Sequence, residues 1–441
     1  MLPSDDDVAA QMMMLRHLSS RRTVLGGLVA AATCGCANGQ PVADALTAET
    51  SPDPVFSPSG PDAEFYGVAD GFPIPSPAQA RVQGNPFHPK YRVGAFSHFD
   101  ELFPTRSIKH ADTPWMFKRE AADIHYSYGG RQSSIAEYLS RNPITGLLIA
   151  KDDRILVEYY QYGRTDRDRL LSQSMVKSIV GMLIGIAVSE GAIKSVADAA
   201  ATYVPGFKGT EYGKTPIRDL LHMSSGVEFG EERNGGSDLN RLWRDMVARP
   251  ASKGTIESLI EFNHRIARPG TRYSYASIEP DVLGMVLHSA VKQSLSDYLR
   301  ERVWQPIGAE ASANWLLDAQ DFEVAHFGFN AVLRDYARLG RLLAYDGAWE
   351  DKQIIPAQWM LDATTVKSSD SYLAPGNATP MAGYGYLLWL LPAPRRQFAM
   401  VGSWGQRVCV DPASKLVMVQ TALDDTPEVW RLWRMLAQQF E

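Results

Sequence analysis

The pattern of hydrophobic and polar residues predicts strands near both ends of the chain and helices between them. Two apolar, β-rich runs at 146–149 and 155–160 flank the polar turn 151–154, and this arrangement predicts a β-hairpin. Residues 175–189 are apolar on nearly every side, which is typical of a helix buried at the centre of a domain. The sequence therefore predicts a hairpin that is followed, after a connecting loop, by a central helix.

After that helix the pattern predicts amphipathic helices and then a return to β-structure. The expected helices, with a capped one ahead of the hairpin, are 134–141, 216–223, 239–248, 255–263, 281–291 and 332–343. The expected strands are 385–391, 397–401, 407–410 and 416–421, followed by a terminal helix over 427–440. This order predicts an α+β domain whose sheet is built from both chain ends, with a helical subdomain inserted between them.

The first residues have the features of an export signal. Ser20-Arg21-Arg22-Thr23-Val24-Leu25-Gly26 reads as a twin-arginine motif, and the apolar run 24–33 behind it is too short to span a bilayer. We therefore expect a signal segment at 1–39, a Pro/Ser-rich linker and extended lead-in at 40–130, and the main domain at 131–441. This interpretation predicts export to the bacterial periplasm or cell envelope. The alternative is that the arginine pair belongs to a frayed basic tail with no targeting role.

Composition excludes several classes of protein. The formal net charge of −6 gives no basic field, so we expect no nucleic-acid partner. Cys34 and Cys36 fall at the end of the signal and are poor lipid-attachment matches, which leaves Cys409 alone in the mature chain. We expect no membrane-spanning segment in the mature chain, and the oligomeric state stays open. Nine histidines without a His-x-x-x-His pair argue against a metal site, and no cofactor is expected.

A Ser-x-x-Lys motif, Ser174-Met175-Val176-Lys177, stands where the central helix begins. Residues three apart share one helix face, so the amine of Lys177 can lie beside the Ser174 hydroxyl. Burial lowers a lysine pKa, and a neutral lysine can accept the serine proton. A second match, Ser289-Ala290-Val291-Lys292, lies at the end of a predicted amphipathic helix, where we interpret it as ordinary surface.

The first match resembles the leading motif of the serine β-lactamases, penicillin-binding proteins and related esterases and amide hydrolases. Residues 269–277, Pro-Gly-Thr-Arg-Tyr-Ser-Tyr-Ala-Ser, resemble the Pro-Gly-x-x-Phe-x-Tyr-x-Asn/Ser stretch of the class C branch. This resemblance implies an antiparallel sheet flanked by helices. It also implies Tyr275 as a catalytic proton carrier and Ser277 at the Asn/Ser position beside the lysine.

Two further segments are similar to the same family. Residues 220–226 resemble its Leu-Leu-x-His-Thr-Ser-Gly segment, and residues 334–340 resemble its Arg-Asp-x-Ala-Arg-Phe-Gly helix. We expect His222, in the first of these, to be structural. The stretch 96–105 looks like the lead-in of the branch that contains the 6-aminohexanoate-dimer hydrolases.

The third family motif departs from its usual form. Neither Lys-Thr-Gly nor His-x-Gly occurs, and Gly402-Ser403-Trp404-Gly405-Gln406 resembles the Gly-x-x-Gly-Gln variant of the aminohexanoate-hydrolase and family VIII esterase branch. Gly402 would permit close backbone approach, so the N–H of Ser403 is a candidate oxyanion donor. The missing cation argues against recognition of a penicillin-type carboxylate.

These features predict a cofactor-free serine hydrolase that cleaves a small amide or ester through an acyl-enzyme on Ser174. A D,D-peptidase or transacylase using the same site is the alternative. A non-catalytic binding module on the same fold is the third hypothesis. Composition does not define the substrate, because specificity lies in loops such as 230–238 and 369–381.

Overall fold

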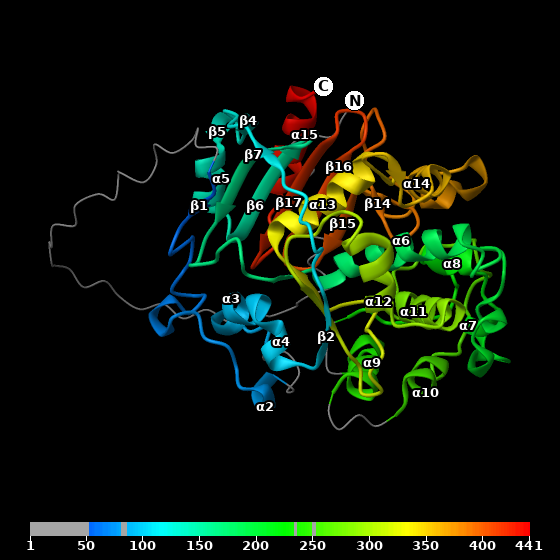
Figure 1. Cartoon of the computed structure of the whole chain (residues 1–441). Coiled ribbons are helices and arrows are strands. Elements are labelled where there is room, and N and C mark those ends of the chain that lie inside the picture. The colour runs from blue at the N-terminus through cyan, green and yellow to red at the C-terminus, as the bar shows by residue number, and fades with distance from the viewer. Residues whose placement is uncertain (1–52, 81–85, 233–235, 249–252) are drawn as a thin grey trace, which may run out of the picture.

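The computed structural model describes residues 53–80, 86–232, 236–248 and 253–441 (Figure 1). The predicted signal segment 1–39, with its arginine pair and with Cys34 and Cys36, lies outside these residues. Within the described part of the chain, no helix is both long and apolar enough to cross a membrane.

The main sheet is assembled from both ends of the domain. Across the described residues it has nine strands in the order β1-β7-β6-β17-β16-β15-β14-β13, with β3 also paired to β7. Their bounds are β1 Val55–Phe56, β3 Lys118–Arg119, β6 Ile144–Lys151, β7 Arg154–Tyr160, β13 Gly383–Tyr384, β14 Trp389–Leu390, β15 Phe398–Gly402, β16 Gln406–Asp411 and β17 Leu416–Ala422. The predicted hairpin is β6–β7, and β17 pairs antiparallel with β6, which confirms the expected architecture. Because β1 and β3 run parallel to β7, the sheet is mixed at that edge.

Alternating side chains of the central strands build two separate cores. Leu148 and Ala150 of β6 belong to the core that contains α13 (Leu333–Ala344), whereas Leu147 and Ile149 belong to the core formed with α5 (Ile135–Arg141) and α15 (Glu428–Gln439). This division follows from the two-residue period of a strand, which sends successive side chains to opposite faces. In Figure 1, α13 lies in front of the sheet and α15 behind it.

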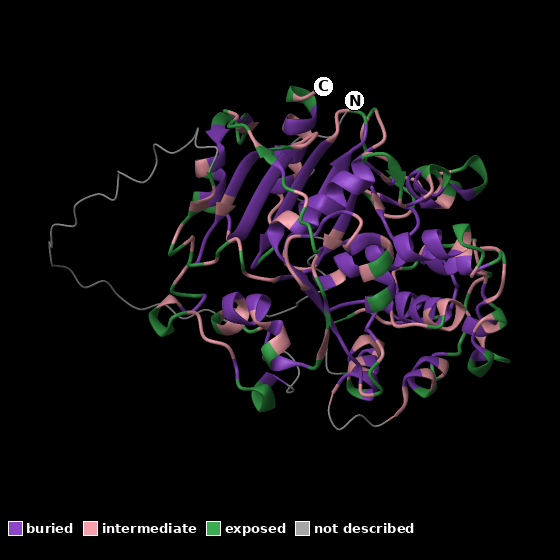
Figure 2. Cartoon of the chain, in the orientation of Figure 1, coloured by how far each residue is buried: buried purple, intermediate pink, exposed green. Residues whose placement is uncertain are grey.

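The inserted helical region packs on the α13 side of the sheet. Its helices are α6 Val176–Ser189, α7 Glu211–Lys214, α8 Ile217–Leu221, α9 Asp238–Met246, α10 Thr255–Ile260, α11 Ile278–Val291 and α12 Leu295–Leu299, and α14 (Ala357–Thr364) follows later in the chain. Helix α11 packs against both α6 and α8, and residues 278–287 are all buried (Figure 2). The predicted helix 281–291 is present within α11, but it is not amphipathic, because neighbouring helices cover it on several sides.

The predicted strand 385–391 is also wrong. Only Trp389 and Leu390 belong to a strand, and the residues before them form a turn in which Gly385 N–H donates to the Leu388 carbonyl. Leu387 in this turn donates its N–H to Leu221 at the end of α8 and accepts the Ser178 hydroxyl of α6. The apolar run therefore leaves the sheet to pack against the central helices.

The lead-in carries regular structure from its first described residues. It contains α2 Pro77–Ala80, α3 Pro89–Ser97, α4 Phe99–Leu102 and β2 Thr105–Ile108, and then the hairpin of β4 His125–Tyr128 and β5 Arg131–Ser134. Strand β2 joins a second sheet of order β2-β9-β10-β8, with β8 at Leu170–Leu171, β9 at Ala313–Leu316 and β10 at Phe329–Ala331. A small hairpin, β11 Ala348–Trp349 and β12 Lys352–Gln353, completes the described strands.

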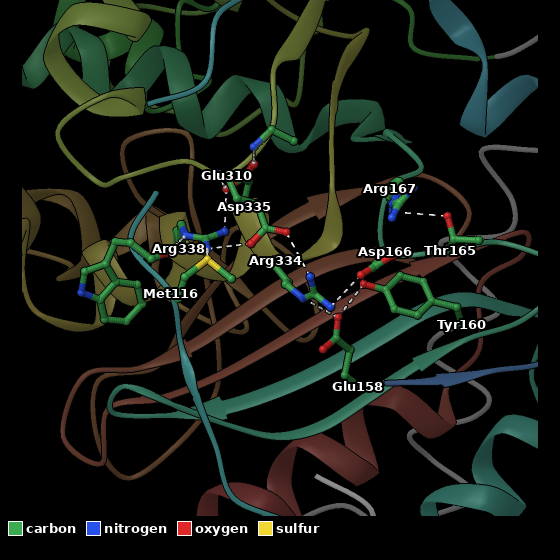
Figure 3. Close-up of polar contacts among 12 residues, drawn as sticks. Met116, Glu158, Tyr160, Thr165, Asp166, Arg167, Glu310, Arg334, Asp335 and Arg338 are labelled. Carbon is green, nitrogen blue, oxygen red and sulfur yellow. Dashed lines mark hydrogen bonds and ion pairs between the residues drawn. The ribbon is translucent and has the colours of Figure 1, made fainter. Parts of the chain in front are cut away.

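A buried charge network fixes α13 to the sheet (Figure 3). Arg334 Nε lies 2.8 Å from Glu158 Oε1 on β7, and Arg338 Nη1 lies 2.7 Å from Asp335 Oδ1. Arg338 also contacts Glu310, with Nη2 and Oε2 2.8 Å apart. Burial raises the pKa of Asp335 to about 6 in spite of the arginine beside it. The Arg-Asp-x-Ala-Arg stretch of the sequence is thus the structural anchor of this helix.

Candidate active site

The second sheet positions the nucleophile segment. Strand β8 pairs with β10, and beyond its end Ser172 N–H donates to the Phe329 carbonyl at 2.8 Å. The backbone then turns at Gln173, whose φ of 49° lies in the left-handed region, and enters a short 3₁₀ turn at Gln173–Met175 that leads into α6. Non-glycine residues adopt such a φ at an energetic cost and are found at functional sites. Ser174 is therefore placed at the junction of a fixed strand and a buried helix.

The structure brings Ser174 and Lys177 together. Lys177 Nζ lies 2.8 Å from Ser174 Oγ, and it also donates to the carbonyl of His326 at 2.9 Å. Lys177 is only 2% exposed, whereas Ser174 is partly exposed. A buried amine in hydrogen-bond contact with a reachable hydroxyl is the arrangement that an activated serine needs.

Tyr275 lies against the same amine. Its ring centroid is 5.1 Å from Lys177 Nζ, and the ring stacks on Trp389 of β14 with a centroid separation of 5.8 Å. Tyr384 meets it edge-on at 6.3 Å. Tyr273 packs in turn on Tyr384, with ring centroids 5.1 Å apart. Burial raises the pKa of Tyr273 and Tyr384 well above 10, so these two phenols stay neutral.

Ser277 has a different partner from the one that the family resemblance implies. Its hydroxyl lies 3.0 Å from Glu231 Oε2, and its backbone N–H donates to Oε1 of the same carboxylate. In the described residues the hydrogen bonds of Lys177 go to Ser174 and His326. Glu231 lies in the loop after Ser224-Ser225-Gly226 and holds the start of α11. No sequence motif pointed to Glu231.

Gly402 provides the close approach that its motif predicts. It ends β15, and a Cβ at this position would lie 2.4 Å from the Ser172 carbonyl oxygen and 2.9 Å from Gln173 Cβ. Gln406 fixes the turn that follows, since its Nε2 donates to the carbonyls of Ser403 and Trp404 at 3.1 and 2.8 Å. The Ser403 turn is therefore held next to the segment that carries the nucleophile.

His222 and the second Ser-x-x-Lys match lie outside this cluster of contacts. His222 ends α8, its ring packs against Tyr386 at 4.8 Å, and burial lowers its pKa to about 3. Ser289 lies in the last turn of α11 and Lys292 is exposed at its end, with a left-handed φ of 59°. The helix therefore ends at Lys292, and this residue does not face the buried side of α11.

The fold and the site together define the chain as a hydrolase of the Ser-x-x-Lys class. The sequence profile of the Beta-lactamase family matches residues 135–437. The chain therefore belongs to the β-lactamase family and is an enzyme of that family.

Three known proteins illustrate the relationship. The 6-aminohexanoate-dimer hydrolase of Paenarthrobacter ureafaciens is 24% identical over 349 residues, which cover 78% of this chain and 88% of that protein. A solved structure provisionally assigned as a 6-aminohexanoate-dimer hydrolase from Bacillus anthracis is similar with a TM-score of 0.72 and 24% identity, covering 80% of this chain and 95% of the other. EstCE1, a hydrolase with promiscuous acyltransferase activity, shares the fold with a TM-score of 0.56 and 16% identity, covering 67% of this chain and 94% of its own.

Proposed function

We propose that the protein hydrolyses a small amide or ester through an acyl-enzyme on Ser174. The observation that carries this proposal is the 2.8 Å contact between Lys177 Nζ and Ser174 Oγ at the start of the buried helix. No metal or cofactor takes part in the proposed reaction. The small-molecule substrate supplies the acyl group, and water accepts it.

The first half of the reaction forms the acyl-enzyme. Lys177 accepts the hydroxyl proton as Ser174 Oγ bonds to the substrate carbonyl carbon. The carbonyl oxygen becomes an oxyanion, held by the backbone N–H groups of Ser174 and Ser403. The C–N or C–O bond then breaks, and Lys177 and Tyr275 deliver the proton to the leaving amine or alcohol.

Water completes the reaction by the same route in reverse. A water molecule attacks the acyl carbon and gives one proton to the Lys177–Tyr275 pair, and this proton returns to Ser174 Oγ as the free acid leaves. The pair therefore ends each cycle as it began. Gly402 supports this step only through geometry, by letting the Ser403 turn approach the nucleophile segment.

The third motif favours substrates without a penicillin-type carboxylate. Neither Lys-Thr-Gly nor His-x-Gly occurs in this chain, so the third motif supplies no cation of that kind for such a group. The P. ureafaciens relative is named as a 6-aminohexanoate-dimer hydrolase, and this name favours a linear amide. We therefore rank linear amides and short esters ahead of β-lactams.

A hydrolysis panel tests the proposal. Purified protein is assayed with p-nitrophenyl esters of short acids, linear amide oligomers, D-amino-acid peptides and nitrocefin, alongside the Ser174→Ala variant. Ser289→Ala is the matched control, because it removes the serine of the duplicate motif on α11. We expect turnover of at least one ester or amide that Ser174→Ala abolishes and Ser289→Ala leaves unchanged. Absence of any turnover, or turnover retained in Ser174→Ala, would contradict the proposal.

Acyl transfer to an amine is a second candidate. EstCE1 is a hydrolase with promiscuous acyltransferase activity, and an Escherichia coli protein provisionally assigned as a D-alanyl-D-alanine carboxypeptidase is 26% identical over 188 residues. Product analysis with added amine acceptors separates the two candidates. Hydrolysis yields only free acid, whereas a transacylase yields a new amide in proportion to the acceptor concentration.

We also propose that the first 39 residues direct export by the twin-arginine route. The support is the Arg21-Arg22 pair ahead of a short apolar run. Cell fractionation of the full chain and of a variant with both arginines changed to lysine tests this. Export of the wild type alone is expected, and equal export of both would contradict it.

A further inference from the structure

A buried carboxylate holds the loop that contacts the catalytic amine. Asp281 lies in the first turn of α11, where Oδ1 accepts the Ala325 N–H at 2.8 Å and Oδ2 lies 2.6 Å from Nδ1 of His326. The side chains of Asp281 and His326 are 3% and 5% exposed. A carboxylate accepts hydrogen bonds and does not donate them, so the imidazole donates from Nδ1.

The loop held in this way carries the carbonyl that binds Lys177. Lys177 Nζ donates to the His326 carbonyl oxygen at 2.9 Å, next to its contact with Ser174. Asp281 thus makes two contacts with consecutive residues of this loop. One is with the backbone N–H of Ala325, and the other is with the side chain of His326. Because one contact is on His326 itself and the other on the residue before it, the two contacts restrain the direction of the His326 carbonyl.

We propose that Asp281 and His326 are positioning residues for Lys177. They hold the His326 carbonyl where it orients the amine toward Ser174 Oγ. The inference rests on the proposed acylation of Ser174 and adds to it two residues that act through the lysine rather than on the substrate.

The same loop contains a carboxylate for comparison. Asp318 is 1% exposed and accepts the backbone N–H groups of Gln320 and Phe322 at 2.8 and 3.0 Å. It therefore fixes the beginning of the loop as Asp281 fixes its end, but its contacts lead away from Lys177. Loss of either carboxylate leaves backbone donors unpaired and lowers stability, whereas only loss of Asp281 releases the carbonyl on the amine.

Four variants test the proposal, each measured for kcat, KM and the rate at which a fluorophosphonate labels Ser174. Asp281→Ala and His326→Phe are expected to lower kcat and the labelling rate by about 10- to 100-fold, since misplacing a catalytic group by about 1 Å costs that much. KM should change by less than about twofold, because the proposed contact acts on the nucleophile and not on substrate binding. His326→Asn keeps an N–H donor near the position of Nδ1 and is expected to recover most of the labelling rate. Asp318→Ala should lower the melting temperature and leave kcat near the wild-type value.

Each result either supports or contradicts the positioning role of Asp281 and His326. Wild-type labelling rates in Asp281→Ala and His326→Phe would overturn the proposal, as would losses that follow the melting temperature across all four variants. If Asp281→Ala does not fold, the comparison of His326→Phe with His326→Asn decides alone, and equal rates in those two refute the positioning role. If the fluorophosphonate does not label Ser174 in the wild-type protein, the proposed acylation fails and this inference fails with it.

Discussion

The buried carboxyl of Glu279 should make the stability of this protein depend strongly on pH. Glu279 is 1% exposed in the first turn of α11, where Oε1 accepts the Ser225 N–H at 3.4 Å. Burial is the main cause that raises its pKa from 4.5 to about 8. At neutral pH the folded protein therefore keeps a proton on Glu279 that the unfolded chain has already lost.

The sign of the effect follows from this difference. As pH rises from about 4.5 to 8, the unfolded state releases the Glu279 proton and the folded state does not, so the free energy of unfolding falls. At about 1.4 kcal/mol per pH unit, this window corresponds to a loss on the order of 5 kcal/mol. Above the folded pKa both states are ionised and this contribution levels off. Below pH 4.5 both states are protonated, and the full stability is present.

Urea unfolding of wild type and Glu279→Gln at pH 5, 7 and 9 measures this effect. Glutamine does not ionise, so the variant should match wild type at pH 5 to within about 1 kcal/mol and exceed it at pH 9 by several kcal/mol. Glu64→Gln is the matched control, since Glu64 is exposed and its change should leave the slope intact. Parallel stability curves for wild type and Glu279→Gln would show that Glu279 is ionised in the folded state and would refute this reasoning.

Three further predictions concern single sites. Gly402→Ala places a Cβ 2.4 Å from the Ser172 carbonyl oxygen, so it should lower kcat by about 10- to 100-fold while the protein still folds; unchanged kcat with an unchanged melting temperature would contradict the close approach. Arg338→Leu leaves Asp335 buried without its arginine and should cost about 3–5 kcal/mol in urea unfolding; a cost below about 1 kcal/mol would show that the pair is not buried as described. Burial raises the pKa of Cys409 to about 12, so an aromatic disulfide reagent at pH 8 should react with this thiol only as fast as the chain unfolds; immediate reaction mapped to Cys409 in the native protein would disprove its burial.

Local patterns predicted most of the main elements. The capping sequence at Ser134 forms α5 with a complete capping box, and the polar turn 151–154 joins β6 to β7 as expected. These elements depend on neighbouring residues, so a single sequence contains the information that forms them. The prediction of a strand over the apolar run 385–391 is wrong, because tertiary contacts of Leu387 with α6 and α8 turn this run out of the sheet.

The contacts of the site likewise include some that follow from local sequence and others that depend on the fold. Ser174 and Lys177 are three residues apart on one turn, so their contact follows from helix geometry and was predicted. Asp281, His326 and Glu231 approach the site from separate segments, and their contacts exist only in the folded chain. The acidic residue in the first turn of α11 is a helix-start signal, but nothing in the sequence pairs it with a histidine 45 positions later.

Trapping of the acyl-enzyme tests the central claim most directly. The protein is mixed with an excess of an activated short-chain ester, quenched in acid within seconds, digested and mapped by mass spectrometry. The account predicts one added acyl group on the peptide that contains Ser174, absent in Ser174→Ala and much reduced in Lys177→Ala. An acyl group on any other residue, or full turnover by Ser174→Ala, would contradict the account.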